Sequence, residues 1–391
     1  MSGRYDMLET PCYIFHEGRF LQRIKEIEQG LPGIPLVFSM KANPFLLSVL
    51  PEQIHRVEVC SPGELAICRR FHIEPERIIY SGVMKEQEDV REAVSYGAAV
   101  LTAESRGHFE LITGVASELK KKVNLILRLS GGNQFGMSRE DIFRIFEDSK
   151  PGRSETYVNL MGIHYYSGTA KTKKKAIERD LKALRELLAD LKDRFGWLPE
   201  LVEYGPGLGA YYFDPPYREK ELALLSEVAD SILDFAGQYP LNVEMGRFLA
   251  APCGEYMTEV KDIKENGNVS YVIVDGGIHQ VNYYGQALAM KIPPLQVIAG
   301  DREAKEEAEK TYCLCGSLCT TADVLVREIS LKPLMTGDRL VFDRVGAYSV
   351  TEAPALFLSR SMPRIYLCHN DGQMSLIRDF IKTDEFVDRP I

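Results

Sequence analysis

Short apolar runs of strand length alternate with longer amphipathic stretches from about residue 35 to about residue 250. The strand candidates are Leu36–Met40, Val57–Cys60, Arg77–Ser81, Ala98–Leu101, Val123–Leu129, Gly162–Tyr166, Leu201–Tyr204 and Leu241–Glu244. Helical spacing marks Gly63–Arg70, Lys85–Ser95, Arg106–Lys120, Lys171–Arg194 and Glu219–Gln238. Eight strands with helices between them predict an α/β fold, a parallel (β/α)8 or TIM barrel.

After Pro252 the pattern changes to short β-rich runs broken by glycine, proline and charge. These runs predict an all-β domain with strands at Tyr256–Ile263, Ser270–Val274, Leu295–Ile298, Glu328–Leu331, Arg339–Phe342 and Arg364–Leu367. Residues 299–311 are charged and poor in apolar side chains, which favours an exposed loop or a short helix. Cys12–Phe15 can join this domain, which gives a barrel at 26–252 and a discontinuous β domain at 1–25 and 253–391.

Composition narrows the class of protein. With 391 residues, 45% of them hydrophobic and 26% charged, we expect a soluble globular protein of two domains. A net charge of −9 argues against nucleic acid or an anionic membrane surface as a partner. No apolar run reaches the roughly 20 residues of a membrane span. The first residues lack the apolar core of a signal peptide, so we expect a cytoplasmic protein.

The eight cysteines do not suggest a disulfide scaffold, and in a reducing cytosol we expect thiols. Cys313, Cys315 and Cys319 cluster without CxxC pairs or a nearby histidine, so no metal site is expected. The other five are expected to be small buried hydrophobic residues: Cys12, Cys60, Cys68, Cys253 and Cys368.

Lys41 stands where the first predicted barrel strand ends, just before an Asn-Pro turn signal. An apolar setting lowers the pKa of a lysine amine, and a neutral amine can condense with an aldehyde. The alternative is that Lys41 extends its ammonium from the barrel rim into water. Active sites of such barrels lie at the carboxyl ends of the strands. Polar and glycine-rich residues after other strands are therefore candidates for the same site: Ser61, 164–169, 205–209 and 244–247.

Two of these segments suggest an anionic and aromatic ligand. In 205–209, Gly-Pro-Gly-Leu-Gly, glycines let backbone N–H groups approach an anion, although a glycine-rich turn without a ligand is equally compatible. Glu244 begins Glu-Met-Gly-Arg and could form a strand-end ion pair with Arg247. Alternatively, Glu244 faces a pyridine nitrogen and keeps it protonated, so that the ring becomes an electron sink. Gly246 would then let the backbone meet a phosphate.

A histidine, two tyrosines and two hydroxyls follow the sixth predicted strand. His164 is either a core histidine with satisfied hydrogen bonds or an aromatic that stacks on a cofactor ring, while Ser167 or Thr169 could donate to a phosphate. In the predicted β domain, neither Cys319, four residues before a carboxylate, nor Tyr348, just after a strand, is informative alone.

Taken in order, seven motifs resemble the fold-type-III pyridoxal-phosphate decarboxylases, the group of ornithine, diaminopimelate and biosynthetic arginine decarboxylases. The resemblance extends from Pro11 to about Ser359. The motifs are Phe38-Ser-Met-Lys41-Ala-Asn43, Val57-Glu-Val-Cys-Ser61-Pro-Gly63-Glu64-Leu65, Gly162-Ile-His164-Tyr-Tyr-Ser-Gly168-Thr169, Gly205-Pro-Gly207-Leu-Gly209, Glu244-Met-Gly246-Arg247, Cys319-x-x-x-Asp323 and Gly346-Ala-Tyr348.

The resemblance implies an alanine-racemase-like barrel with a C-terminal β domain, pyridoxal 5'-phosphate as cofactor, and a head-to-tail homodimer with shared active sites. Lys41 is similar to the Schiff-base lysine, His164 to the residue that stacks on the cofactor ring, and Glu244 to the partner of the pyridine nitrogen. The cofactor-binding residues it implies are Lys41, Glu58, His164, Ser167, Thr169, Gly205, Gly207, Glu244, Gly246, Arg247 and Tyr348.

Cys319 and Asp323 would reach the active site of the partner subunit, with Cys319 as the acid that protonates the carbanion after carbon dioxide leaves. The catalytic residues are thus Lys41, Glu244 and Cys319. The substrate-binding residues implied are Tyr166, Cys319, Thr320, Asp323 and Tyr348.

The chain departs from the family pattern where the substrate side chain is recognised. Tyr166 occupies a place that usually holds a small residue, and Glu58 replaces an aspartate. Thr320 stands where the ornithine and diaminopimelate enzymes have a carboxylate that binds a distal ammonium, and Tyr283–Pro294 contains no aspartate or glutamate. A buried ammonium without an anionic partner costs several kcal/mol (roughly, for a buried charge).

These departures favour a substrate other than free ornithine, lysine or diaminopimelate. Asp275-Gly-Gly-Ile-His279, Gly285-Gln286 and Tyr166 resemble a branch of secondary metabolism that decarboxylates conjugated or carrier-protein-tethered amino acids. Three alternatives stay open: a decarboxylase of free diamino acids, an amino-acid racemase and a non-catalytic regulator. Racemases of this fold usually face the pyridine nitrogen with arginine rather than with a carboxylate such as Glu244, and the intact set of functional residues weighs against a regulator.

Overall fold

The structure is a computed structural model that describes residues 5, 7–148, 157–300 and 308–388. The chain forms two compact units. The barrel unit comprises Arg23–Ala210 and Arg218–Leu249, and the β unit comprises Met1–Gln22, Tyr211–Tyr217 and Ala250–Ile391. The functional domain boundaries expected at 25/26 and 252/253 stay a prediction.

Eight parallel strands close the barrel in chain order, from β2 to β9. β9 pairs with β2 through Val243 and Leu36, which completes the ring. The strands are β2 Leu36–Ser39, β3 Ile54–Val59, β4 Ile78–Tyr80, β5 Val100–Ala103, β6 Val123–Leu129, β7 Val158–Tyr166, β8 Leu201–Gly205 and β9 Leu241–Met245. The predicted (β/α)8 barrel is confirmed, and each predicted strand overlaps an observed one.

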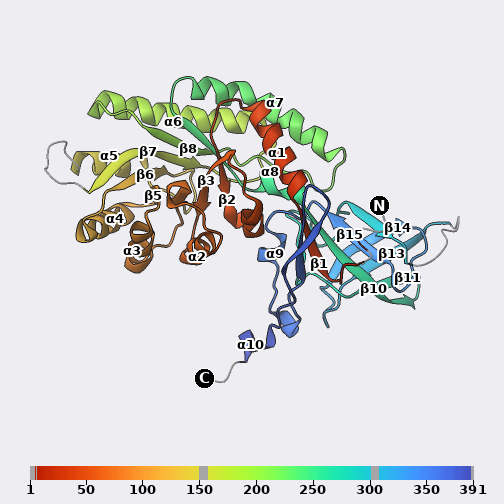
Figure 1. Ribbon diagram of the computed structural model, residues 1–391. Helices are drawn as coiled ribbons and strands as arrows, with labels where there is room; N and C mark the ends of the chain where they lie inside the picture. Colours follow the sequence, from red (N-terminus) through yellow and green to blue (C-terminus); the bar gives the residue numbers. More distant parts are fainter. Residues whose placement is uncertain (1–4, 6, 149–156, 301–307, 389–391) are drawn as a thin grey trace. The chain divides into compact units, whose positions relative to one another are not determined.

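Figure 1 shows helices along the outside of the barrel strands. They are α2 Pro62–Arg70, α3 Gln87–Tyr96, α4 Arg106–Leu119, α5 Arg139–Asp148, α6 Lys174–Phe195 and α7 Tyr217–Ala236. Apolar spacing determines which face is buried, because α6 buries Ile177, Leu181, Leu184, Leu188 and Leu191, all three or four residues apart. The side chains of Ser61 and Ser105 cap α2 and α4 by accepting a backbone N–H of the first turn.

The sequence reasoning missed α1 Glu17–Gly30 and α5, as well as the short α8 Arg247–Ala250. The interior of the barrel is apolar at one level, where Val37, Ile79, Val100, Ile126 and Leu201 form a cluster. No helix in the described ranges is long and apolar enough to span a membrane.

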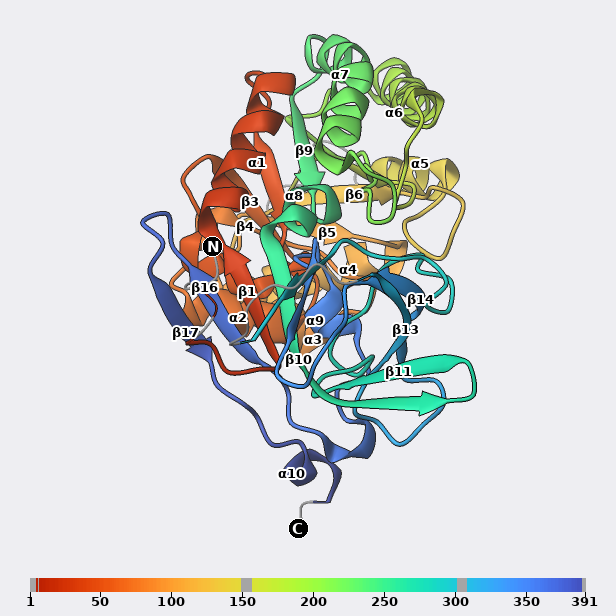
Figure 2. The ribbon, with the colours of Figure 1, turned by 90° about the vertical axis from the view of Figure 1, so that its right-hand side faces the viewer.

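The β unit is built on a sheet in the order β14-β13-β11-β10-β1-β16-β17, with β15 paired to β10 and β12. Its strands are β1 Cys12–His16, β10 Gly254–Asn266, β11 Val269–Val274, β12 Leu295–Ile298, β13 Lys310–Cys315, β14 Val324–Leu331, β15 Arg339–Asp343, β16 Arg364–Cys368 and β17 Met374–Arg378. Figure 2 shows this unit with the short helix α10, Asp384–Val387, near the C-terminus.

The prediction that Cys12–Phe15 joins the β domain is confirmed. β1 pairs antiparallel with β10 and parallel with β16, and all five of its residues are buried. Two strands were missed, β13 and β17. The prediction of a loop or short helix at 299–311 is wrong at its end, where Lys310 begins β13, and 301–307 lie outside the described residues.

Candidate active site

Lys41 lies in a single 3-10 turn, Met40–Ala42, that follows β2 directly. Its Nζ atom is 2.8 Å from Oε2 of Glu58, which lies on the neighbouring strand β3. The Lys41 side chain is 40% exposed, whereas that of Glu58 is 4% exposed. Lys41 therefore does not lie in an apolar setting, because the amine faces a buried carboxylate and is partly open to solvent.

Cys60 was expected to be a small buried hydrophobic residue, and this expectation is wrong. Its Sγ atom lies 3.4 Å from Nζ of Lys41 and 3.2 Å from Oε1 of Glu58. Burial and then the charge of Glu58 raise the pKa of the Cys60 thiol well above its usual value, so the thiol keeps its proton. The spacing of Glu58 and Cys60, two residues apart on one strand run, is the signal that could have placed both on the same face.

Glu244, near the end of β9, is the buried anion of the barrel. Ser39 Oγ donates a hydrogen bond of 2.6 Å to Oε1, and His164 Nε2 lies 3.2 Å from Oε2. Burial alone would raise the pKa of the Glu244 carboxyl. The hydrogen bond from His164 and the positive charge of Lys41 outweigh burial and hold that pKa well below its usual range. Glu244 is thus an ionised carboxylate; Ser39 was not anticipated.

His164 is buried on β7 and is not the fully satisfied core histidine of the alternative reading. Nε2 faces Glu244, but Nδ1 has no hydrogen-bond partner in the described part of the chain. Its strand neighbour on β8 is Glu203, which is also buried. Neither carboxyl oxygen of Glu203 has a hydrogen-bond partner among the described residues.

Glu203 is a second buried carboxyl that the sequence reasoning missed. Burial, and then the charge of Glu244, raise the pKa of Glu203 well above its usual value. The barrel therefore holds two acidic side chains on adjacent strands in opposite states: Glu244 is ionised and Glu203 is protonated. Neighbouring carboxyls that cannot both ionise are held in separate states by their environments.

The glycine turn after β8 makes room for an aromatic ring. A Cβ atom on Gly205 would lie 2.7 Å from Cδ2 of Tyr166, and one on Gly207 would lie 1.9 Å from the carbonyl oxygen of Gly168. Gly207 also has φ +62°, which a side chain would strain. These glycines allow the turn to approach the segment after β7, and the Tyr166 ring occupies part of the space above them.

The hydroxyls of Ser167 and Thr169, which lie in this same segment after β7, have different partners. Ser167 Oγ donates 2.8 Å to Oδ1 of the buried Asp180 on α6, to which Lys171 and Tyr204 also bond. Asp180 was not anticipated, and it fixes the Ser167 hydroxyl. Thr169 is exposed and interacts with the Tyr166 hydroxyl.

A buried ion pair, also missed, joins Arg128, near the end of β6, to Glu104, which directly follows β5. Arg128 Nη1 bonds Glu104 Oε1 at 2.6 Å, and the other carboxylate oxygen accepts the Gly136 N–H at 3.1 Å. The Arg128 guanidinium lies 6.0 Å from the centre of the Tyr166 ring. Gly246 and the buried Arg247 follow β9 directly, at the start of α8.

In the β unit, a turn between β13 and β14 carries Cys319, which is exposed, and Thr320. The carboxylate of Asp323 is 2% exposed and accepts the backbone N–H groups of Leu318, at 2.7 Å, and Ile278, at 2.8 Å. Asp323 therefore holds the turn together. This geometry favours a positioning role over the expected substrate contact.

Tyr348 adopts φ +66° with ψ −31°, a sparsely populated conformation that costs about 1 kcal/mol or more for a residue with a side chain. Gly346, two residues before it, lies against the segment between α8 and β10: its N–H bonds the Ala251 carbonyl at 3.1 Å, and a Cβ atom would lie 2.1 Å from the Ala250 carbonyl oxygen. Strain of this kind is concentrated at functional sites.

The barrel has the features of a pyridoxal-phosphate enzyme. A lysine follows its first strand, an ionised carboxylate lies near the end of its last strand, and a glycine turn follows the strand before that one. The chain belongs to the pyridoxal-dependent decarboxylase family. The family model described as "Pyridoxal-dependent decarboxylase, pyridoxal binding domain" matches residues 17–251. The protein is a pyridoxal-phosphate-dependent amino-acid decarboxylase, as the resemblance implied.

Among curated relatives, the L-glutamyl-[BtrI acyl-carrier protein] decarboxylase of Niallia circulans is 28% identical, covering 97% of this chain and 93% of that protein. The 2-[(L-alanin-3-ylcarbamoyl)methyl]-2-hydroxybutanedioate decarboxylase of Staphylococcus aureus is 26% identical, covering 91% and 93%. Among solved structures, the diaminopimelate decarboxylase of Helicobacter pylori with L-lysine has a TM-score of 0.84 at 21% identity, covering 97% and 96%. At that identity the structural likeness supports the fold alone.

Proposed function

We propose that this decarboxylase acts on an α-amino acid whose side chain is conjugated or tethered to a carrier protein, rather than on a free diamino acid. The observation that carries the proposal is the absence of a carboxylate where a distal ammonium would be bound. Thr320 follows Cys319, and its hydroxyl accepts the Ala322 N–H at 3.3 Å. Residues 283–294, all described, contain no acidic side chain.

The curated relatives support the proposal in part. The printed names of the Niallia circulans and Staphylococcus aureus proteins describe, respectively, a glutamyl group on a carrier protein and an amide conjugate of alanine. Several diaminopimelate decarboxylases also match, for instance that of Methanocaldococcus jannaschii at 25% identity, so free diaminopimelate is the competing substrate.

The residues of the barrel fit pyridoxal phosphate. Glu244 is the buried, ionised carboxylate that a protonated pyridine nitrogen needs, and His164 has a nitrogen without a partner in the described part of the chain. Bound pyridoxal phosphate supplies a protonated ring that accepts the electron pair released when the α-carboxylate leaves as carbon dioxide. We propose Lys41 as the residue that binds the cofactor covalently, with Ser167, Gly207, Gly246, Arg247 and Tyr348 at the phosphate.

Three side chains, those of Glu244, Glu58 and Cys319, then have separate roles in binding and proton transfer. Glu244 remains ionised and holds a proton on the ring nitrogen by charge. Glu58 lies 2.8 Å from the Lys41 amine and orients it at the end of β2. Cys319, exposed on its turn, gives a proton to the α carbon of the substrate, from the partner subunit of a homodimer. We propose that this homodimer has shared sites and a cytoplasmic location.

Steady-state release of carbon dioxide tests the proposal. The holoenzyme is given 3-(acylamino)alanines, γ-glutamyl thioesters, free diaminopimelate, ornithine and lysine at equal concentration. We expect kcat/KM for at least one 3-(acylamino)alanine or γ-glutamyl thioester to exceed that for every free diamino acid by about 100-fold or more, the effect of an unpaired ammonium in a closed site. An efficiency near ~10⁵ M⁻¹s⁻¹ for a free diamino acid would refute it.

A further inference from the structure

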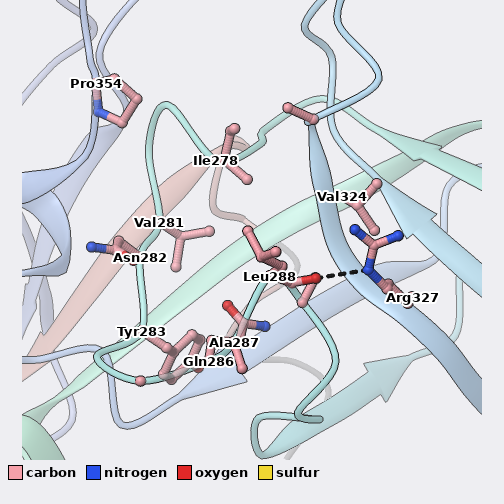
Figure 3. Close-up of a pocket in the computed structure, with 13 residues that line it drawn as sticks. Ile278, Val281, Asn282, Tyr283, Gln286, Ala287, Leu288, Val324, Arg327 and Pro354 are labelled. Carbon is pink, nitrogen blue, oxygen red and sulfur yellow. Dashed lines mark hydrogen bonds between the residues drawn. The ribbon is translucent and has the colours of Figure 1, made fainter.

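The β unit contains a cavity of about 570 Å³, but its wall shows no prepared contact for a ligand. Figure 3 shows Val324 and Arg327 on one side of it, Val281 and Asn282 on the other, and Leu288 between them. The Nε atom of Arg327 already donates 2.8 Å to the Leu288 carbonyl of the same wall. None of the described lining residues has a buried side-chain nitrogen or oxygen without a partner. The chemistry of this wall therefore selects no ligand.

The barrel unit, in contrast, holds a buried charged cluster beside the residues proposed for the cofactor phosphate. It consists of Ser167, Lys171, Asp180 and Tyr204, all within the barrel unit. The side chain of Asp180 is fully buried, and that of Lys171 is 8% exposed. A lysine and an aspartate are seldom removed from water to this degree unless they form a pair. Because this pair lies next to Ser167, its charges act on the place proposed for the phosphate.

The Ser167 hydroxyl has one proton, which it donates to Oδ1 of Asp180 at 2.8 Å. A phosphate dianion only accepts hydrogen bonds, so a phosphate beside Ser167 receives this proton only if Asp180 gives it up. A buried carboxylate that loses a donor is destabilised unless other donors remain. Lys171 Nζ and the Tyr204 hydroxyl, the latter at 3.1 Å, are such donors, and both bond Oδ2 of Asp180. Asp180 can therefore release Ser167 and still be paired.

The charge of Asp180 alone would oppose a phosphate at this place. Only the Ser167 hydroxyl, 2.8 Å from Oδ1, would separate the carboxylate from a phosphate bound to that hydroxyl. Two like charges this close repel each other strongly where water is excluded. The ammonium of Lys171, bonded to the other oxygen of the carboxylate, cancels the charge of Asp180. Lys171 therefore removes a repulsion that the phosphate would otherwise meet.

The backbone of Lys171 is bonded to the glycine turn after β8. Its N–H donates to the Gly207 carbonyl and its carbonyl accepts the Gly209 N–H, both at 2.9 Å. Ala170, just before it, has φ +56°, a left-handed conformation that a residue with a side chain keeps only where other contacts hold it. Lys171 thus ties together three parts of the barrel: the segment after β7, the glycine turn and, through Asp180, the helix α6.

We infer that Lys171 is a positioning residue which, through Asp180 and Ser167, makes the barrel select the phosphorylated form of the cofactor. Its ammonium neutralises Asp180 and keeps that carboxylate paired when Ser167 donates to the phosphate. The inference rests on the proposed phosphate site and adds to it a residue that acts by compensating a charge. It involves neither the β unit nor the substrate.

Binding of two cofactor forms to the full-length apoprotein tests the inference. Pyridoxal 5'-phosphate and pyridoxal share the ring and the aldehyde and differ in the phosphate, and both dissociation constants are measured by equilibrium dialysis and visible absorbance. In Lys171→Met we expect the Kd of pyridoxal phosphate to rise by about tenfold or more, the effect of a broken buried pair, and that of pyridoxal to change less than about threefold. Lys175→Met, at an exposed lysine of α6, should leave both unchanged.

The double variant Lys171→Met/Asp180→Asn separates charge compensation from a general loss of structure. It removes both charges, and the amide oxygen at position 180 still accepts the Ser167 proton. We expect its affinity for pyridoxal phosphate to return to within about threefold of the unchanged protein, because replacing a buried pair as a whole costs less than breaking it on one side. Asp180→Asn alone keeps the ammonium and should prefer the phosphorylated form more strongly than the double variant does. This last comparison carries the test even where Lys171→Met does not fold.

The outcomes separate this inference from the proposed function. An unchanged preference for the phosphorylated form in Lys171→Met, or an equal loss of both forms, overturns the inference and leaves the proposed phosphate site standing. A double variant as weak as Lys171→Met assigns Lys171 a structural role and overturns it as well. An unchanged protein that binds both forms equally refutes the proposed phosphate residues together with the inference. The proposed substrate is tested independently, since no substrate enters these measurements.

Discussion

His164 on β7 and Glu244 on β9 face each other inside the barrel, with Nε2 3.2 Å from Oε2. Glu203, on the strand between them, is buried beside this pair and yet takes no part in it. The contact stabilises the ionised form of Glu244, and the resulting negative charge helps to keep Glu203 protonated. His164, together with the positive charge of Lys41 and the Ser39 hydroxyl, thus favours charge on Glu244, while burial keeps Glu203 neutral.

Glu244→Gln should lower kcat by about 100-fold or more, because an amide cannot hold a proton on the ring nitrogen by charge. The measurement is carbon dioxide release at saturating substrate, together with the visible absorbance of the cofactor. Glu203→Gln is the matched control: it replaces a carboxyl that is already neutral with an amide of the same shape, so kcat should change less than about threefold. Equal losses of kcat in both variants would contradict the assignment of an ionised Glu244 and a neutral Glu203.

Cys319→Ala should leave the cofactor bound and slow turnover by roughly 100-fold or more, the usual size of a lost general acid. Cys315→Ala is the control, since this thiol lies four residues earlier, on β13, beside Cys313 Sγ at 3.7 Å. Its burial raises the pKa of Cys315 to about 12, which makes it a poor proton donor to substrate. A Cys319→Ala enzyme with full turnover would exclude this thiol from the mechanism.

Mixing two inactive proteins, Lys41→Ala and Cys319→Ala, should restore activity if sites are shared across a homodimer. Random exchange of subunits makes half of the dimers mixed, and each mixed dimer holds one intact site. We therefore expect about a quarter of the unchanged activity per site, after dilution and reassociation. Activity that stays at the level of the separate variants would show that each site is contained in one chain.

The stability of the protein should fall in acid because of His279. This histidine is 1% exposed, and neither ring nitrogen has a hydrogen-bond partner in the described part of the chain. Burial, and secondarily the charge of Arg360, lower the pKa of His279 from 6.5 to about 4. Only the unfolded chain binds the proton between these values, so stability is lost as pH falls from about 6.5 to about 4.

Urea unfolding at pH 7.5 and at pH 4 measures this effect. Relative to His279→Leu, which cannot titrate, the unchanged protein should lose up to about 3 kcal/mol of unfolding free energy over that interval. A parallel pH dependence in the two proteins would assign the acid sensitivity to other groups. His72→Leu, at an exposed position, should leave the pH dependence as it is.

The sequence allowed the barrel to be predicted because its strands are apolar runs separated by amphipathic helices. The strand β13 was not predicted because it begins with two polar residues, Lys310 and Thr311, at an exposed end. The helix α5 was not predicted because it is only ten residues long, and its apolar positions, of which Ile142 and Ile145 are buried, span little more than one turn. Whether a segment such as β13 forms a strand depends less on its local composition than on its pairing with distant strands.

Candidates for the site could be chosen from the sequence where a residue type is rare at a strand end, as for Lys41 and Glu244. It was not predictable where partners come from other strands. Ser39 is an ordinary residue until the barrel closes and brings it to Glu244, and Cys60 is an ordinary thiol until β3 lies beside β2. Nothing in the local sequence of Glu203 signals a neutral carboxyl, because its state depends on the charge of Glu244 on the adjacent strand.

The position of β1 has a consequence for synthesis on the ribosome. This strand of five buried residues emerges first, yet its two sheet neighbours begin at Gly254 and Arg364. A nascent chain must therefore keep Cys12–His16 sheltered while more than three hundred further residues are made (roughly, from the spacing along the chain), because an open apolar strand edge invites aggregation. Truncation before β16 leaves that edge open, so loss of the short strand Arg364–Cys368 alone endangers the whole fold.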